Sequence, residues 1–179
     1  MDEVAVRADN GLPVISFNTF QAQHKDLSRE EFLAQIQDPY VMLVRSSTHS
    51  GSGSGFHTVK FTKEAVDSAS EDQANLLPVR KRADGNAFGI MITMGRASNN
   101  DLVIPNQKIS KFHAYFRQMG SSWRISDANS RNGTFLDGVE VPKEQGSEIQ
   151  NGARIKLAKT VELIFYTPAG LFERLQADD

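Results

Sequence analysis

Past residue 55 the chain consists mainly of short apolar runs separated by turn sequences. Some runs, such as 123–126 (WRIS), alternate apolar and polar residues, as a strand with one buried face does. The pairs Asp137-Gly138 and Asn151-Gly152 are strong hairpin signals. The pattern predicts an all-β sandwich. We expect strands at 56–62, 76–82, 89–94, 102–104, 114–118, 123–126, 134–136, 139–141, 154–157 and 161–166.

Before residue 56 the pattern predicts one helix and one strand. Ser28 and Glu31 form a capping box, in which each side chain satisfies a free backbone donor of the first helical turn. Apolar residues at 32, 33 and 36 follow at helical spacing, and Asp38-Pro39 ends the helix expected at 28–37. Residues 40–44 (YVMLV) are expected to form a short buried strand. Residues 1–27 show no sustained periodicity and are expected to be a partly ordered tail.

A chain of 179 residues accommodates one domain, or one domain with an extension. We expect an N-terminal extension over 1–55 that ends in the Gly/Ser linker 46–55, and a connecting strand with a polar segment over 56–78. Within the latter, 63–75 could be a loop or a short helix. The sandwich domain is expected over 79–170 and a C-terminal helix and tail over 171–179, with the helix itself at 171–175.

Composition and charge narrow the choice of function. The chain has no cysteine, which removes disulfides and thiolate chemistry, and no apolar run long enough to span a membrane. The N-terminus is polar and acidic, so a cytoplasmic protein is expected. Residues 80–131 carry nine Lys or Arg against three Asp, a local charge of +6, while the remainder carries −8. Such a basic face on an acidic protein suits a small anionic partner better than a nucleic acid; a scatter of solvated cations is the alternative.

Three turn sequences carry residues suited to holding a phosphate ester on a peptide. Arg96 follows an apolar strand and Gly95, and a guanidinium can donate two parallel hydrogen bonds to phosphate oxygens. Ser110 can donate its hydroxyl hydrogen, and the Asn132 carboxamide can both donate to and accept from a peptide backbone. His113 lies in a semi-apolar run far in sequence from the other histidines, so a structural role is favoured over a catalytic or metal-binding one.

These motifs resemble those of the forkhead-associated (FHA) domain, and the chain resembles bacterial proteins with a single such domain. The similarity covers about residues 79–166, roughly half of the chain. The matching sequences are Gly95-Arg96, Asn100-Asp101, SKFHA from Ser110, DANSRNGTFLDG from Asp127 and NGARI from Asn151. The resemblance implies an FHA-type sandwich of about ten or eleven strands, with a small α/β N-terminal extension and a short C-terminal helix.

The resemblance also implies a role for each matching residue. It assigns phosphate binding to Arg96 and Ser110, and peptide backbone binding to Asn132. It assigns loop support to Gly95, His113, Gly133 and Thr134. Gly133 is expected to have a positive φ, and Thr134 to begin a strand.

Two positions extend this expected site. In the family a small hydroxyl residue often precedes the Asn-Gly pair, whereas this chain has Arg131. Lys111 occupies a position that is frequently basic. We hypothesise that both cations line the pocket rim and favour acidic residues beside the phosphothreonine. Lys108 could instead contact a side chain further along the peptide.

Three classes of function are compared. The first is a non-enzymatic phosphothreonine reader, whose partner is a phosphothreonine-containing protein such as a Ser/Thr kinase or its substrate. The second is a phosphate-independent structural or oligomerisation module that uses the same surface; the oligomeric state stays open. An enzyme is disfavoured, because the SGSGSG run lacks the context of a nucleotide loop and no nucleophile–base spacing is present. No cofactor, metal, nucleic-acid or membrane partner is expected.

Overall fold

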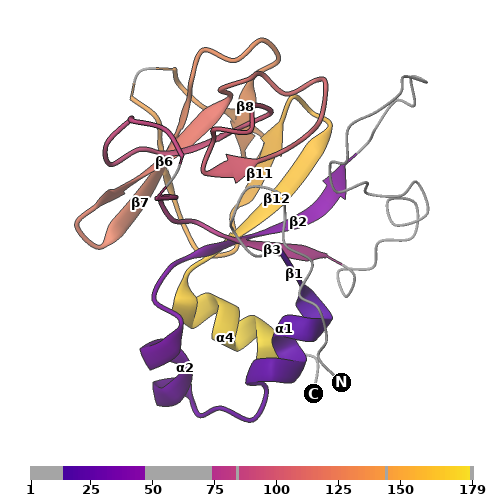
Figure 1. Cartoon of the computed structure of the whole chain (residues 1–179), viewed down its shortest axis with the longest axis vertical. Coiled ribbons are helices and arrows are strands. Elements are labelled where there is room, and N and C mark those ends of the chain that lie inside the picture. The colour runs from indigo at the N-terminus through magenta and orange to yellow at the C-terminus, as the bar shows by residue number, and fades with distance from the viewer. Residues whose placement is uncertain (1–13, 47–73, 84, 144, 178–179) are drawn as a thin grey trace.

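The computed structural model describes residues 14–46, 74–83, 85–143 and 145–177. In this part of the chain two β-sheets pack face to face, and helices cover the outer face of the larger sheet (Figure 1). The predicted all-β sandwich with a short C-terminal helix is therefore confirmed. The helices are α1 (Phe17–His24), α2 (Arg29–Gln35) and α4 (Pro168–Gln176).

The two sheets differ in size and in the segments that form them. The larger sheet has seven strands in the order β1 (Ile15–Ser16), β3 (Asn75–Pro78), β2 (Tyr40–Ser46), β12 (Val161–Tyr166), β11 (Arg154–Leu157), β8 (Thr134–Leu136) and β9 (Val139–Glu140). The smaller has five strands in the order β10 (Ser147–Ile149), β7 (Ser122–Asp127), β6 (Ala114–Met119), β4 (Ile92–Gly95) and β5 (Leu102–Val103). The larger sheet thus combines strands from both ends of the described chain.

The central strands of the larger sheet are buried on both faces. Val41 and Leu43 of β2 belong to the core between the sheets, whereas Met42 belongs to the core beneath the helices. In β12, Phe165 belongs to the core between the sheets and Ile164 to the core beneath the helices. Because successive side chains of a strand point to opposite faces, a doubly buried strand has a nearly continuous apolar sequence. This explains the unbroken apolar run at 40–44.

The described part of the N-terminal segment, residues 14–39, contains more regular structure than its sequence indicates. The capping box of α2 is confirmed, with the Ser28 side chain and the Glu31 side chain each bonded to the other's backbone N–H. A partly ordered tail was expected up to residue 27, and the described part of it, 14–27, contains β1 and α1. Ser16 caps α1, and Phe17 and Phe20 are buried beneath it. Only two apolar residues anchor this helix, which is too few to give a recognisable period.

Several strand boundaries differ from the expected ones. The strand expected at 76–82 ends at Pro78, and the Val79 N–H bonds to the Pro39 carbonyl instead. The strand expected at 89–94 begins only at Ile92, because Gly89 has a φ of +54° in a turn. Strand β10 was not expected, and α4 is longer than the predicted 171–175.

Some expectations are not tested by this structure. The strand at 56–62, most of the polar segment at 63–75 and the linker from 47 onward lie outside the described residues. The division into four segments also stays a prediction, although β2, expected in the extension, lies between β3 and β12. No helix in the described ranges is long and apolar enough to cross a membrane.

Candidate functional site

Three loops meet at one end of the sandwich, and they hold all the residues expected to bind a phosphopeptide. They follow β4, precede β6 and follow β7, and hydrogen bonds join each to another. The Arg96 N–H donates to the Ser110 carbonyl at 2.9 Å, and the Arg131 N–H donates to the Ser110 hydroxyl oxygen at 3.0 Å. The Asn132 side chain donates to the Lys108 carbonyl at 2.7 Å. The structure therefore brings the separate sequence motifs together.

Arg96 is exposed but held at its base. Its Nε donates to the Ile109 carbonyl at 3.1 Å, which fixes the plane of the guanidinium. Within the described ranges, the two terminal nitrogens of Arg96 have no hydrogen-bond partner. No carboxylate oxygen of those ranges lies within 4 Å of the Arg96 guanidinium. A guanidinium anchored through Nε and open at both terminal nitrogens can accept a phosphate through two parallel bonds.

Ser110 and Asn132 keep part of their hydrogen-bonding capacity. The Ser110 oxygen accepts from Arg131, so its hydroxyl hydrogen is available to an acceptor outside the chain. The Asn132 amide nitrogen is used by Lys108, and its carbonyl oxygen has no partner in the described part of the protein. The first group can donate to a phosphate oxygen, and the second can accept from a backbone N–H of a bound peptide.

His113 is completely buried behind these loops and ties two of them together. Its Nδ1 accepts from the Ser110 N–H, and its Nε2 donates to the Gly133 carbonyl, both at 3.1 Å. These partners require the neutral ring with its hydrogen on Nε2. Burial lowers the pKa of His113, an effect opposed by the Gly133 carbonyl and by Asp127. The geometry is that of a loop-supporting residue with no face open to a ligand.

The loop glycines permit contacts that a side chain would block. Gly95 is buried, and a Cβ there would collide with the Lys111 carbonyl. Gly133 has a φ of +79°, the left-handed region expected from the sequence. Thr134 begins β8, and its hydroxyl donates to Asp127 at 2.7 Å.

Two buried residues shape the loops, and the sequence motifs that contain them did not indicate their roles. Asn100 donates to the carbonyls of Ala97 and Lys111 at 2.8 and 2.6 Å, which links the first loop to the second. Asp127 accepts from the backbone and hydroxyl of Ser130, at 2.8 and 2.6 Å, and so shapes the loop before Asn132. The Asp-x-x-Ser spacing is the signal that could have identified this turn.

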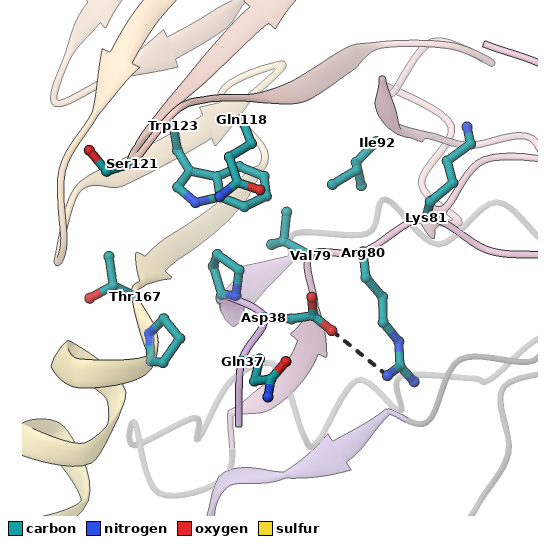
Figure 2. Close-up of a pocket in the computed structure, with 12 residues that line it drawn as sticks. Gln37, Asp38, Val79, Arg80, Lys81, Ile92, Gln118, Ser121, Trp123 and Thr167 are labelled. Atoms are coloured by element: carbon teal, nitrogen blue, oxygen red, sulfur yellow. Dashed lines mark ion pairs between the residues drawn. The ribbon is translucent and has the colours of Figure 1, made fainter. Parts of the chain in front are cut away.

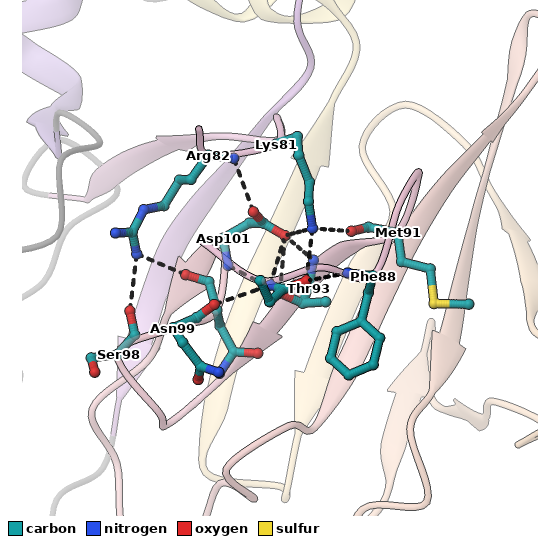
Figure 3. A network of polar contacts seen from close by, with 10 residues as sticks. Lys81, Arg82, Phe88, Met91, Thr93, Ser98, Asn99 and Asp101 are labelled. Atoms are coloured by element: carbon teal, nitrogen blue, oxygen red, sulfur yellow. Dashed lines mark hydrogen bonds and ion pairs between the residues drawn. The ribbon is translucent and has the colours of Figure 1, made fainter. Parts of the chain in front are cut away.

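A buried carboxylate fixes the segment that precedes the first loop. Asp101 accepts from the Arg82 N–H, from Thr93 and from the Lys81 ammonium, which lies 3.1 Å away (Figure 3). Burial alone would raise the pKa of Asp101, but these hydrogen bonds outweigh it and lower the pKa below its ordinary value. Asn100 and Asp101 are therefore buried residues whose hydrogen bonds hold the first loop and the segment before it in place.

The face of the three loops is cationic. Arg96, Lys108, Lys111 and Arg131 are all exposed, and none has a carboxylate within 4 Å among the residues described. Among the residues described, Lys111 and Arg131 form hydrogen bonds through their backbones, and both residues are exposed at the rim. These are four of the nine basic residues counted over 80–131, whereas Arg80 lies at the opposite end of the fold.

A pocket of about 380 Å³ lies at the opposite end of the sandwich (Figure 2). It is lined by residues from the turn between β6 and β7, from the chain after β3 and from the start of α4. Asp38 and Arg80 form an ion pair across it at 3.8 Å, and both are partly exposed. None of the residues expected to bind a phosphopeptide lies here, so the pocket is separate from the three-loop site.

Comparison with known proteins identifies the class of domain. Residues 92–158 match the family model of the FHA domain. The chain therefore contains an FHA domain, and its three loops, His113 and the Asn132-Gly133 turn lie within the matched residues. FHA domains are binding modules.

Curated relatives include FHA domain-containing proteins called FhaB from two species. The protein from Mycolicibacterium smegmatis is 31% identical over 105 residues, which cover 50% of this chain and 66% of the relative. The protein from Mycobacterium tuberculosis is 32% identical over 69 residues, which cover 38% and 43%. The matched region thus spans just under two thirds of the length of the M. smegmatis protein and less than half of the length of the M. tuberculosis protein.

Solved structures of FHA proteins show a partial likeness. The yeast Dun1 FHA domain, solved with a doubly phosphorylated peptide, has a TM-score of 0.48 at 20% identity and covers 74% of this chain and 75% of its own. Mycobacterium tuberculosis EmbR, solved with a low-affinity phosphopeptide, has a TM-score of 0.49 at 14% identity and covers 84% and 28%.

Proposed function

We propose that this protein binds phosphothreonine-containing segments of other proteins through the three-loop end of its FHA domain. The observation that carries the proposal is the convergence of Arg96, Ser110 and Asn132 at one end, each anchored by a neighbouring loop and each with unused hydrogen-bonding groups. The site is preformed, because hydrogen bonds within the protein fix the loops. Preformed donors reduce the entropy lost on binding.

Each of these residues is proposed to bind a different part of the phosphopeptide. Arg96 and the Ser110 hydroxyl bind the phosphate, whose charge of about −1.5 to −2 and three acceptor oxygens suit such donors. Asn132 holds the peptide backbone beside the phosphothreonine through its free carbonyl oxygen. The exposed side chains of Lys111 and Arg131 favour acidic flanking residues, and Lys108 contacts a residue further along the peptide.

The proposed partner is a phosphothreonine-containing protein of a Ser/Thr kinase pathway, either a kinase or its substrate. A reader of this kind performs no chemical step, so the proposal assigns no enzymatic activity to the chain. It also places the protein in the cytoplasm, as expected from the sequence. Fractionation of cells that express a tagged chain tests the location.

Calorimetry with paired peptides tests the proposal. The phosphothreonine form should bind and the unmodified threonine form should not. Arg96→Ala removes hydrogen bonds to a charged group, worth about 1.5–3 kcal/mol each, so affinity should fall roughly tenfold to a hundredfold with the fold retained. Arg80→Ala is a matched control, because Arg80 is an exposed arginine at the opposite end of the sandwich.

Two results would contradict the proposal. Equal affinity for the phosphorylated and unmodified peptides would show that the protein does not recognise the phosphate. Concentration-dependent self-association that free phosphothreonine peptide does not change would instead support the oligomerisation module. Sedimentation with and without the peptide makes this second comparison.

A further inference from the structure

A second surface adjoins the three loops and has no assigned role. It is a groove of about 460 Å³ on the outer face of the five-stranded sheet. Phe112 and Tyr115 lie in it, with Phe88 and Met91 on one side and Asn129 and Lys143 on the other. We call it the aromatic groove. Tyr115 lies on β6 between Ala114 and Phe116, which are buried in the core, so its ring belongs to the opposite face of the sheet.

The aromatic groove is an ordered apolar surface that water can reach. Phe88 is 52% exposed, yet its ring stacks on Phe112 with centroids 5.2 Å apart and an interplanar angle of 17°. Phe112 in turn lies 5.9 Å from Tyr115, centroid to centroid. Three successive rings in contact form a continuous surface, and a surface of this kind marks a binding site more often than an isolated exposed side chain does.

Polar contacts hold the exposed wall of the groove in place. The Phe88 N–H donates to the Asn86 carboxamide at 3.1 Å, and Lys81 donates to both Asn86 and the Met91 carbonyl at 2.8 and 3.0 Å. Lys81 is itself paired with buried Asp101. Figure 3 shows the Phe88 ring and the Met91 side chain projecting away from that carboxylate. The wall is thus fixed in advance of binding, which lowers the entropy that a ligand must offset.

The groove is continuous with the proposed phosphopeptide site through two loops. Phe112 directly follows Ser110 and Lys111, and Asn129 directly precedes the Ser130–Asn132 turn. A polypeptide whose phosphothreonine is bound at the loops therefore has the groove beside it. Binding two parts of one ligand at adjoining surfaces strengthens both, because the second contact is intramolecular.

Charge around the groove narrows the chemistry of its occupant. Lys143 lies at its edge and bonds to Asn129 at 2.9 Å, and Arg117 lies over the Tyr115 ring at 5.5 Å from its centroid. Asp127 also lines the groove, but it is buried and both of its carboxylate oxygens accept hydrogen bonds from its own loop. An apolar floor with a cationic rim suits an apolar side chain flanked by acidic residues.

We propose that the aromatic groove binds a large aliphatic or aromatic side chain of the same polypeptide that carries the phosphothreonine, with acidic residues beside it. This proposal rests on the proposed function of the three-loop site. It adds a second element of selectivity, located on the sheet face and set by Phe88, Phe112 and Tyr115, that phosphate recognition alone does not provide.

The test uses a phosphothreonine peptide library in which Leu, Phe and Ala are exchanged at every position on both sides of the phosphothreonine, in an acidic background. The native chain should prefer Leu or Phe over Ala at one position by about threefold to tenfold, the gain typical of an added aromatic contact. Phe88→Ala should abolish this preference and leave the affinity for the Ala peptide unchanged. Ile90→Ala is the matched control, because Ile90 is 77% exposed on the same segment but does not line the groove.

Binding of the same peptides by Arg96→Ala shows whether the three-loop site is used, so a failure of the groove proposal can be distinguished from a failure of the proposed function. If the phosphothreonine is required but no position shows an apolar preference, or if Phe88→Ala retains the preference, the groove proposal is overturned and the three-loop site stands. If binding does not depend on phosphate or on Arg96, the proposed function fails, and the groove proposal fails with it. Loss of self-association in Phe88→Ala would assign the groove to a second copy of the chain and also overturn the proposal. Thermal melting confirms that each variant is folded, and Phe88→Leu replaces Phe88→Ala if the latter is not.

Discussion

The three-loop end and the helical face of the larger sheet are held together by different forces. At the loops, hydrogen bonds of 2.6–3.1 Å join backbone and side-chain groups, and the cations between them are exposed. On the helical face, Phe17, Phe20 and Phe32 are packed against Met42 and Leu76 with almost no exposure. The first arrangement fixes directions, and the second removes apolar surface from water.

The two kinds of interaction serve two different tasks, which are ligand binding at the loops and stabilisation of the fold at the helical face. Hydrogen bonds are directional and contribute little net stability each, so they suit loops that must present donors to a ligand. Apolar burial is non-directional and contributes most of the stability. Changes on the helical face should therefore affect folding without affecting recognition, and changes at the loops should do the reverse.

The largest expected effect is on the helical face. Phe32 is fully buried and contacts the rings of Phe20 and Phe172, at centroid distances of 6.3 and 5.4 Å. Phe32→Ala should lower the free energy of unfolding by about 3–5 kcal/mol, as loss of a buried aromatic side chain does. Phosphopeptide affinity should stay the same at temperatures where the variant is folded. Denaturant unfolding and calorimetry measure the two quantities.

The control for Phe32→Ala is Met119→Ala, which removes an exposed side chain and should change little. A large loss of phosphopeptide affinity in folded Phe32→Ala would show that the two regions are coupled.

An intermediate effect of the opposite kind is expected at Ser110. Ser110→Ala removes the acceptor of the Arg131 N–H and the proposed donor to phosphate. Affinity should fall roughly tenfold or more, because the lost bond involves a charged group, while the free energy of unfolding falls by only about 0.5–1.5 kcal/mol. Ser121→Ala is the control, since Ser121 is an exposed serine at the far pocket. Unchanged affinity in Ser110→Ala would remove Ser110 from the ligand.

The smallest effect is a dependence of stability on pH through His113. Its pKa is lowered by burial, so the unfolded chain binds a proton at a higher pH than the folded one. The contribution is fully present above the ordinary histidine pKa of about 6.5 and is lost as pH falls from there towards the lowered value. Unfolding measured across this range, with NMR titration of the ring, tests it. A ring that titrates at or above the ordinary value would contradict the prediction.

His113→Gln serves as the control for this pH dependence, because it removes the titrating group from the site. Asp101 acts in a separate range, since its carboxyl pKa lies below the ordinary value and its contribution is lost only in stronger acid. Stability is the better readout here, because the phosphate of the ligand itself titrates near pH 6.

Sequence patterns predicted elements well where local signals agreed with packing. Strands β8, β11 and β12 have the expected bounds, and the α2 capping box is present. Helix α1 was missed, because Phe17 and Phe20 are stabilised by contacts with distant strands and not by a local period. Strand β10 was missed for a similar reason: only Ile149 is buried, and its pairing with β7 is not visible in three residues.

At the candidate site, the sequence indicated which residues lie in turns, and the structure shows how those turns meet. The link between Asn132 and the Lys108 carbonyl joins residues from two loops, and such a contact leaves no local trace in the sequence. The assignment of Arg96, Ser110, Lys111, Arg131 and Asn132 to ligand binding stays a prediction. The aromatic groove was not foreseen, because Phe88 contacts Phe112 only in the folded chain.

The position of β2 between β3 and β12 has a consequence for synthesis of the protein. Tyr40 pairs with Tyr166, and Val41 with Phe165, so a central strand of the larger sheet is made long before its neighbour on one side. Until the last residues of β12 leave the ribosome, β2 has an unpaired edge and apolar side chains on both faces. Pairing over such a separation is slow to form, and exposed strands of this kind are prone to aggregate. We therefore expect the nascent chain to be most prone to aggregation before β12 pairs with β2.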